Sequence, residues 1–139
     1  MDLQAKLTKA VEQGHESEVE KLLQQGAKPN AELVGKATGE WYNPNIARAL
    51  IEDGNFDIND RGQRLTMTGK NLNSYIENAA VRGDLALLAF LLQLPNANYA
   101  TNELERVGDM VTKRYASIIS MLNKAKDKVT EEDYYFDRD

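Results

Sequence analysis

The residues that could do chemistry are sparse, and the first candidate is the segment 62–70, which ends in Gly69-Lys70. A phosphate-binding loop needs four residues between its two glycines and a Ser or Thr after the lysine, so that backbone N–H groups and the hydroxyl meet phosphate and Mg²⁺. Here six residues lie between Gly62 and Gly69, and Asn71 follows the lysine. This spacing argues against nucleotide binding and favours an exposed loop.

A catalytic or metal site would have to form around His15, because it is the only histidine and the chain has no cysteine. No partner is spaced for such a role. Glu16, Glu18 and Glu20 follow it, but carboxylates near a helix N-terminus are favoured by the helix dipole and are typical of a solvated face. His15 itself follows a glycine, which favours a structural role in a turn. We therefore predict no catalytic residue, no metal site and no cofactor, in a protein that is not an enzyme.

Basic side chains are concentrated in the second half of the chain. Residues 61–129 carry ten Lys or Arg against six Asp or Glu, whereas residues 1–60 carry six against eleven, so the net charge of −5 hides blocks of opposite sign. The cations could contact phosphate or RNA, form a simple solvated helix end, or meet the chain's own acidic tail. The lack of uniform basicity argues against a nucleic-acid partner. The basic residues beside Tyr115 are Arg106, Lys113, Arg114, Lys124, Lys126 and Lys128.

Trp41 and Tyr42 are candidate anchors for a partner. Trp41 is the only tryptophan, and the pair stands directly before Asn43-Pro44, an expected N-cap followed by proline at the first helical position. A single Trp is usually packed and partly buried. At a turn between helices the pair could equally anchor an interface, because Trp and Tyr concentrate binding energy there.

Apolar residues recur at helical spacing through most of the chain, and strand signals are nearly absent. Leu3, Leu7 and Val11 mark one face of a helix that ends near Gly14, and Ser17 is the expected N-cap of the next helix. Residues 101–124 carry two weaker faces, which fit either a helix pair or one longer, bent helix. Other helical faces end near three further chain breakers, Gly54, Gly83 and Pro95.

These helical units repeat along the chain. The segment 10–15 (AVEQGH) aligns with 79–84 (AAVRGD), and Leu22-Leu23 then meets Leu91-Leu92 without a gap. Leu50-Ile51 fits the same frame, 28 residues after the first leucine pair. The register therefore holds over three units.

The repeated pattern resembles the ankyrin repeat family, whose units carry two small residues, a Gly-His or Gly-Asp turn, a leucine pair and Gly-Ala-Asp-x-Asn. The first unit matches through Gly14-His15, Leu22-Leu23 and the segment 26–30 (GAKPN). The resemblance implies an all-α fold of stacked helix-turn-helix ankyrin-like repeats, a short α-solenoid, that binds a protein partner through loop tips and a concave face. The family's Thr-Pro-Leu-His start is missing, and its nearest counterpart is 74–77 (SYIE).

On this basis we expect an ankyrin-like repeat domain over residues 1–129 and an acidic aromatic C-terminal tail over residues 130–139. The repeat units are expected at about residues 3–30, 31–59, 74–98 and 101–124, with a long loop at 60–73. Partner contacts are expected mainly from the segments 35–43 and 60–73. The predicted partner-binding residues are Trp41, Tyr42, Arg61, Arg64, Met67, Lys70, Tyr134, Tyr135 and Phe136.

The tail, TEEDYYFDRD, combines five acidic residues and one arginine with three consecutive aromatics. Three interpretations stay open. The aromatics could cover the apolar end of the last repeat, which every repeat array must protect from water. They could form a short linear motif for a partner. The tail also resembles a bacterial type IV secretion signal, because it is acidic with a hydrophobic residue four from the end, and ankyrin repeats are common among such effectors.

No apolar run approaches the roughly 20 residues that a membrane span needs, and the N-terminus lacks the basic start and apolar core of a signal peptide. We expect a monomeric, cytoplasmic protein without a membrane partner, or one in the host cytoplasm if it is a translocated effector. The first functional prediction is a non-catalytic protein–protein interaction module. The alternatives are a secreted bacterial effector with ankyrin repeats and a small ligand- or nucleotide-binding protein.

Overall fold

The computed structural model describes residues 2–60 and 74–128, and these residues form an all-helical fold. The described part of the chain contains seven helices and no strand, which confirms the all-α prediction at that level. No helix among these residues is both long and apolar enough to cross a membrane. The helices are α1 (Leu3–Gln13), α2 (Glu16–Gln24), α3 (Ala31–Thr38), α4 (Pro44–Glu52), α5 (Tyr75–Arg82), α6 (Leu85–Leu92) and α7 (Thr101–Asp127).

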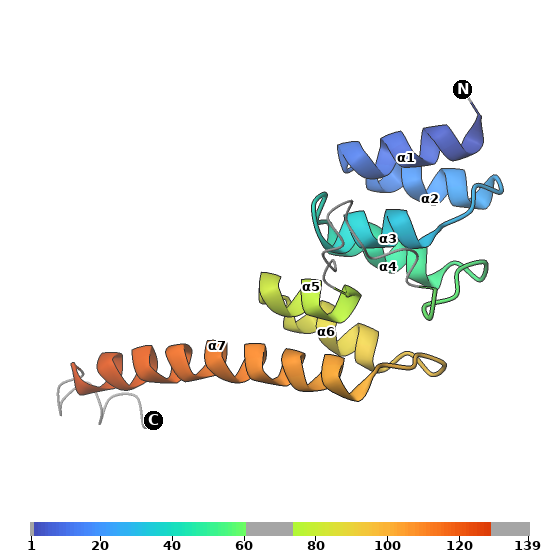
Figure 1. Ribbon diagram of the computed structural model, residues 1–139. Coiled ribbons are helices and arrows are strands. Elements are labelled where there is room, and N and C mark those ends of the chain that lie inside the picture. Colours follow the sequence, from blue (N-terminus) through green and yellow to red (C-terminus); the bar gives the residue numbers. More distant parts are fainter. Residues whose placement is uncertain (1, 61–73, 129–139) are drawn as a thin grey trace, which may run out of the picture.

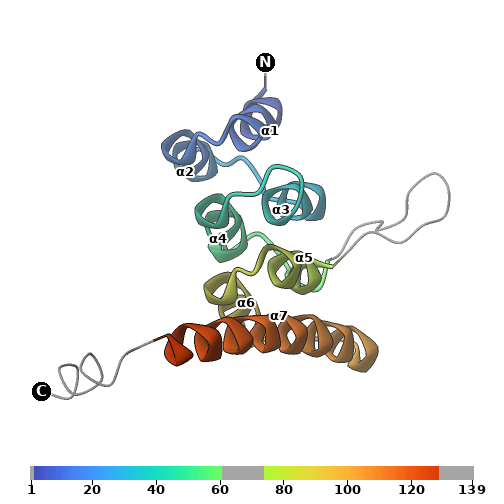
Figure 2. The same ribbon diagram turned by 90° about the vertical axis from the view of Figure 1, so that its left-hand side faces the viewer.

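The first six helices form three antiparallel pairs that stack in chain order. Consecutive helices pack together as α1 with α2, α3 with α4 and α5 with α6. The first helices of the pairs form one row, α1, α3 and α5, while α2 packs on α4 beside it (Figure 2). The single long helix α7 packs on α5 and closes one end of the stack (Figure 1).

Left-handed glycines close the tight turns of the first and third pairs. Gly14 and Gly83 have φ values of 72° and 70°, and both cap the preceding helix with backbone N–H bonds. A side chain at either position would be strained, because L-residues rarely adopt positive φ. The predicted N-cap at Ser17 is wrong, since α2 begins at Glu16 and His15 occupies the cap position. The helix starts directly after the two-residue turn, so Ser17 lies inside the helix and cannot cap it.

The turn between α3 and α4 is longer than the other two. It spans residues 39–43, whereas residues 14–15 join α1 to α2 and residues 83–84 join α5 to α6. Backbone bonds fold it against α3, because the N–H of Trp41 donates to the carbonyl of Lys36 at 2.8 Å and that of Asn43 to Ala37 at 2.9 Å. Asn43 then caps α4, and Pro44 takes the first helical position, as expected.

The helix α3 contains residues 35–38 of the segment 35–43, so only residues 39–43 of this expected contact segment lie in a turn. Its buried face uses mainly small side chains, Ala31, Gly35, Ala37 and Thr38, beside Leu33 and Val34. Such residues give a weak apolar period. Thr38 is nonetheless fully buried inside the stack, and its hydroxyl donates a hydrogen bond to the Val34 carbonyl at 3.0 Å.

The segment 101–124 forms one continuous helix and not a helix pair. The 27 residues of α7 extend about 40 Å at 1.5 Å per residue. Only its first half finds an apolar partner: Val107 is buried, and Met110 and Val111 are partly buried against the core. The second half projects beyond α5 and α6 (Figure 1).

The core runs through the stack from Leu7 to Val107, with Tyr75 the largest side chain that is fully buried. The exposed apolar side chains, in contrast, gather at one end. Among the described residues, every large hydrophobic side chain that is exposed belongs to α5, α6 or α7. They are Val81, Leu85, Leu92, Leu104, Tyr115, Ile118, Ile119, Met121 and Leu122.

Candidate functional site

A hollow of about 490 Å³ lies where the turns of successive helix pairs meet. We call it the turn hollow. It contains both predicted anchors, Trp41 and Tyr42, which the extended turn carries to this side of the stack. It is lined by Val11, Glu12, Gln13, Gly14, Glu40, Trp41, Tyr42, Asn43 and Arg82.

Tyr42 is held by the next helix pair. Its hydroxyl donates a hydrogen bond to Oδ2 of Asp84, and the Arg82 guanidinium lies 5.1 Å from the centroid of its ring. Partial burial and the hydrogen bond to Asp84 raise the pKa of Tyr42 to about 12. Arg82 also donates to the carbonyl of Gly39 at the start of the same turn. The turn is therefore fixed from two sides.

Trp41 is held less tightly and keeps a partly exposed ring. The Nζ atom of Lys36 lies 5.1 Å from the ring centroid, within the range of a cation–π contact. The same ammonium pairs with the Glu40 carboxylate at 2.7 Å. Lys36 and Glu40 thus orient one side of the indole, and its remaining surface faces the hollow.

Sequence reasoning found Trp41 and Tyr42 but missed the residues that position them. Lys36 stands five residues before Trp41 on α3, a helix that apolar spacing does not mark. Arg82 and Asp84 flank a predicted turn, but their contacts span more than 40 residues of sequence, which a local pattern does not reveal. The remaining predicted site residues, Arg61, Arg64, Met67, Lys70, Tyr134, Tyr135 and Phe136, lie outside the described residues, as does the phosphate-loop-like segment 62–70.

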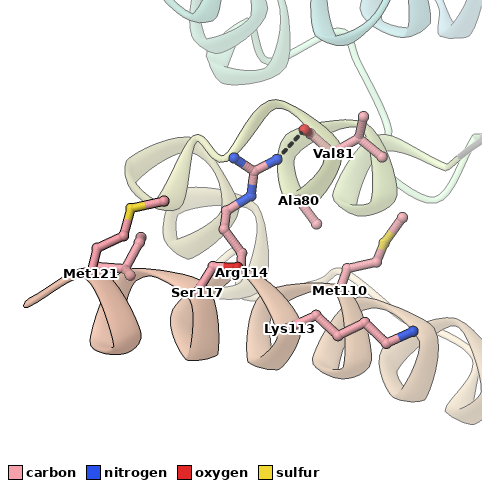
Figure 3. Close-up of a pocket in the computed structure, with 8 residues that line it drawn as sticks. Ala80, Val81, Met110, Lys113, Arg114, Ser117 and Met121 are labelled. Atoms are coloured by element: carbon pink, nitrogen blue, oxygen red, sulfur yellow. Dashed lines mark hydrogen bonds between the residues drawn. The ribbon is translucent and has the colours of Figure 1, made fainter. Parts of the chain in front are cut away.

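A second hollow lies at the other end of the molecule, between the end of α5 and the exposed half of α7 (Figure 3). We call it the α5/α7 groove. Its volume is about 620 Å³, and no acidic side chain is among its lining residues. These residues are Ala80, Val81, Met110, Lys113, Arg114, Ser117, Ile118 and Met121.

Two arginines fasten α7 to α5 beside this groove. Arg114 donates to the carbonyl of Val81 at 2.7 Å, as Figure 3 shows, and its guanidinium lies against the open side of Gly83. Arg106 pairs with the buried carboxylate of Glu77 at 3.1 Å. Burial opposes the charge of Glu77, but hydrogen bonds from Arg106 and Ser74 outweigh that effect and hold the pKa of Glu77 below its ordinary value.

Neither hollow brings together the groups of a nucleophilic or acid–base site. In the part of the chain that the structure describes, no three acidic or histidine side chains are arranged to hold a metal ion. His15 is exposed at the N-cap of α2, and the carboxylates of Glu16, Glu18 and Glu20 lie on the exposed surface. The turn hollow offers aromatic and charged surface, and the α5/α7 groove offers aliphatic and cationic surface. Both kinds of surface suit recognition of another polypeptide.

Comparison with known proteins identifies no relative: no family model, no curated protein and no solved structure matches the chain.

Proposed function

We propose that this chain is a non-catalytic protein-interaction module built from ankyrin-like repeats, and that a protein partner binds at the turn hollow. The three stacked helix pairs, the left-handed glycines at two turns and the leucine-bearing second helices support the ankyrin-like description. In such an array each pair buries one helical face against its neighbour, so the turns are free to vary.

The observation that carries the proposal is the three-residue extension of the turn between α3 and α4. Two residues are enough to join the helices of the first and third pairs, so the fold does not require five. The extended turn carries Trp41 and Tyr42, and both are buttressed by charged side chains from other positions. Turns that are longer than the connection between two helices requires often carry binding residues.

The chemistry of the turn hollow defines the partner it fits. Trp41 offers a partly exposed aromatic ring, and Glu12 and Glu40 contribute exposed carboxylates to the same hollow. The partner would place an apolar side chain on the indole and hydrogen-bond donors or cations toward the two carboxylates. Because Tyr42 is already fixed by Asp84 and Arg82, little conformational entropy would be lost there on binding.

The test is affinity capture with the full chain followed by identification of the retained proteins. We expect Trp41→Ala to lose a partner that the parent chain and Tyr115→Ala both retain, because Tyr115 is an exposed aromatic on α7, away from the turn hollow. Circular dichroism checks that each variant is folded. Binding that survives Trp41→Ala but disappears in Tyr115→Ala would place the partner on α7 and overturn the proposal.

A further inference from the structure

The exposed half of α7 continues the apolar face that its first half buries. Val107 is buried in the core, and Val111, Ile118 and Met121 follow it at spacings of 4, 11 and 14 residues, which places them on the same side of the helix. Ile118 is 44% exposed and Met121 68% exposed. Among the residues that the structure describes, none covers this apolar helix face over its last turns.

The α5/α7 groove, at the start of this uncovered face, has a definite charge. Its floor is apolar, with Val81, Ile118 and Met121, and its two charged residues are Lys113 and Arg114 (Figure 3). Lys124, Lys126 and Lys128 continue the positive charge toward the end of α7, where Asp127 is the one acidic residue among the last eight. An occupant that matches this surface combines apolar bulk with several carboxylates.

We propose that residues 130–139 of the same chain bind in the α5/α7 groove. Tyr134, Tyr135 and Phe136 would cover Ile118 and Met121, and the acidic residues on either side of them would face the lysines of α7. This segment has five acidic residues and one arginine around the three aromatics, so it matches both the apolar and the cationic parts of the surface. Aromatic side chains bury a large area and therefore contribute most to such docking.

The length of the connection permits this contact. Tyr134 is seven positions after Asp127, and an extended chain covers about 24 Å over that many steps. Asp127 is nine positions after Ile118, which is a rise of only about 14 Å along the helix. The aromatic residues can therefore return along α7 to the groove with length to spare. Covalent attachment also gives them an effective concentration of the order of millimolar, which favours them over a partner from solution.

The absence of cysteine from the sequence permits a direct test by disulfide trapping in the full chain. Ser117→Cys places a thiol in the groove with little change in volume, and Asp137→Cys places another beside the aromatics. A control pair combines Asp137→Cys with Ala116→Cys, an exposed position of α7 at the same distance along the helix that does not line the groove. We expect the groove pair to form an intramolecular disulfide at least tenfold faster than the control pair.

Two further variants separate the contributions of charge and apolar contact. The first adds Lys113→Glu and Lys124→Glu to the groove pair and should slow disulfide formation several-fold at low salt. Arg114 is kept in this variant because it donates a hydrogen bond to α5. Replacing Tyr134, Tyr135 and Phe136 by Ser should reduce trapping to the control rate. Equal rates for the groove and control pairs would overturn the proposal. Trapping only as a covalent dimer would also overturn it, since the occupant would then be a second copy.

Discussion

Tyr42 and Asp84 join two helix pairs through one hydrogen bond, because the hydroxyl on the turn before α4 donates to the carboxylate that begins α6. The same carboxylate accepts the N–H of Leu87 at 2.9 Å through its other oxygen and so caps α6. One side chain thereby fixes both the start of a helix and the position of the extended turn in the preceding pair.

Tyr42→Phe should lower the free energy of unfolding by about 1 kcal/mol, because it removes this hydrogen bond and keeps the ring. Asp84→Ala should cost more, since it removes the cap of α6 as well. Urea denaturation followed by circular dichroism measures both. Equal losses for the two variants would contradict the double role of Asp84.

The contribution of Tyr42 should also depend on pH. Its pKa is raised from 10.0 to about 12, so the folded state favours the neutral hydroxyl. The stabilisation is complete below pH 10 and is lost as the pH rises from 10 to 12. The stability difference between the parent and Tyr42→Phe should therefore shrink over this range. All other groups are the same in both proteins and cancel in the difference.

Removing the charge of Glu77 should loosen the attachment of α7. Glu77 is buried and accepts hydrogen bonds from Arg106, so Glu77→Gln should lower the melting temperature by several degrees. The lowered pKa of Glu77 means that its contribution is present above its ordinary value of 4.5 and disappears as the pH falls below it. The difference in melting temperature should follow that dependence. Glu105→Gln, at an exposed position of α7, is the matched control.

Gly83→Ala should destabilise the chain more than Gly14→Ala, although both glycines have nearly the same positive φ. The backbone strain is about 1–2 kcal/mol at each position. At position 83 the new methyl would lie 2.7 Å from Nη1 of Arg114, whereas at position 14 it would lie 3.9 Å from Nδ2 of Asn43. In an Arg114→Ala background the extra cost at position 83 should vanish. Thermal unfolding of the four variants gives this coupling directly.

Tyr75→Phe should reveal a buried link between the second and third pairs. The Tyr75 hydroxyl donates to the carbonyl of Asp60 at 2.8 Å, and its ring is fully buried. Loss of this hydroxyl removes the hydrogen bond and should cost about 1 kcal/mol in urea unfolding. Tyr115→Phe is the control, because its ring is exposed on α7 and the change should have almost no effect.

The helices with a strong apolar period could be predicted from sequence, and so could the turns at Gly14 and Gly83. Ser74 and Glu77 form a capping box at the start of α5. The helix α3 could not be predicted, because Ala, Gly and Thr on its buried face give little hydropathy contrast. The helix α7 is continuous because no proline separates its two apolar faces. The apolar pattern alone left open whether these faces belong to one helix or to two.

Only part of the candidate site could be predicted, and the reason differs from that for the helices. Trp41 and Tyr42 stood out by residue type and by their place before Asn43-Pro44. Arg82 and Asp84 reach them across the interface of two helix pairs, and Arg106 reaches Glu77 across 29 positions. Such contacts depend on the register of the stack, and no local spacing encodes that register.

The one-sided distribution of exposed apolar side chains limits how copies of this molecule can assemble. A filament needs a donor surface at one end and a matching acceptor at the other. Here α5, α6 and α7 carry all the exposed large hydrophobic side chains of the described residues, and the α1–α2 end carries none. Association through that surface would bring the same end of two copies together, and such a contact would not continue head to tail.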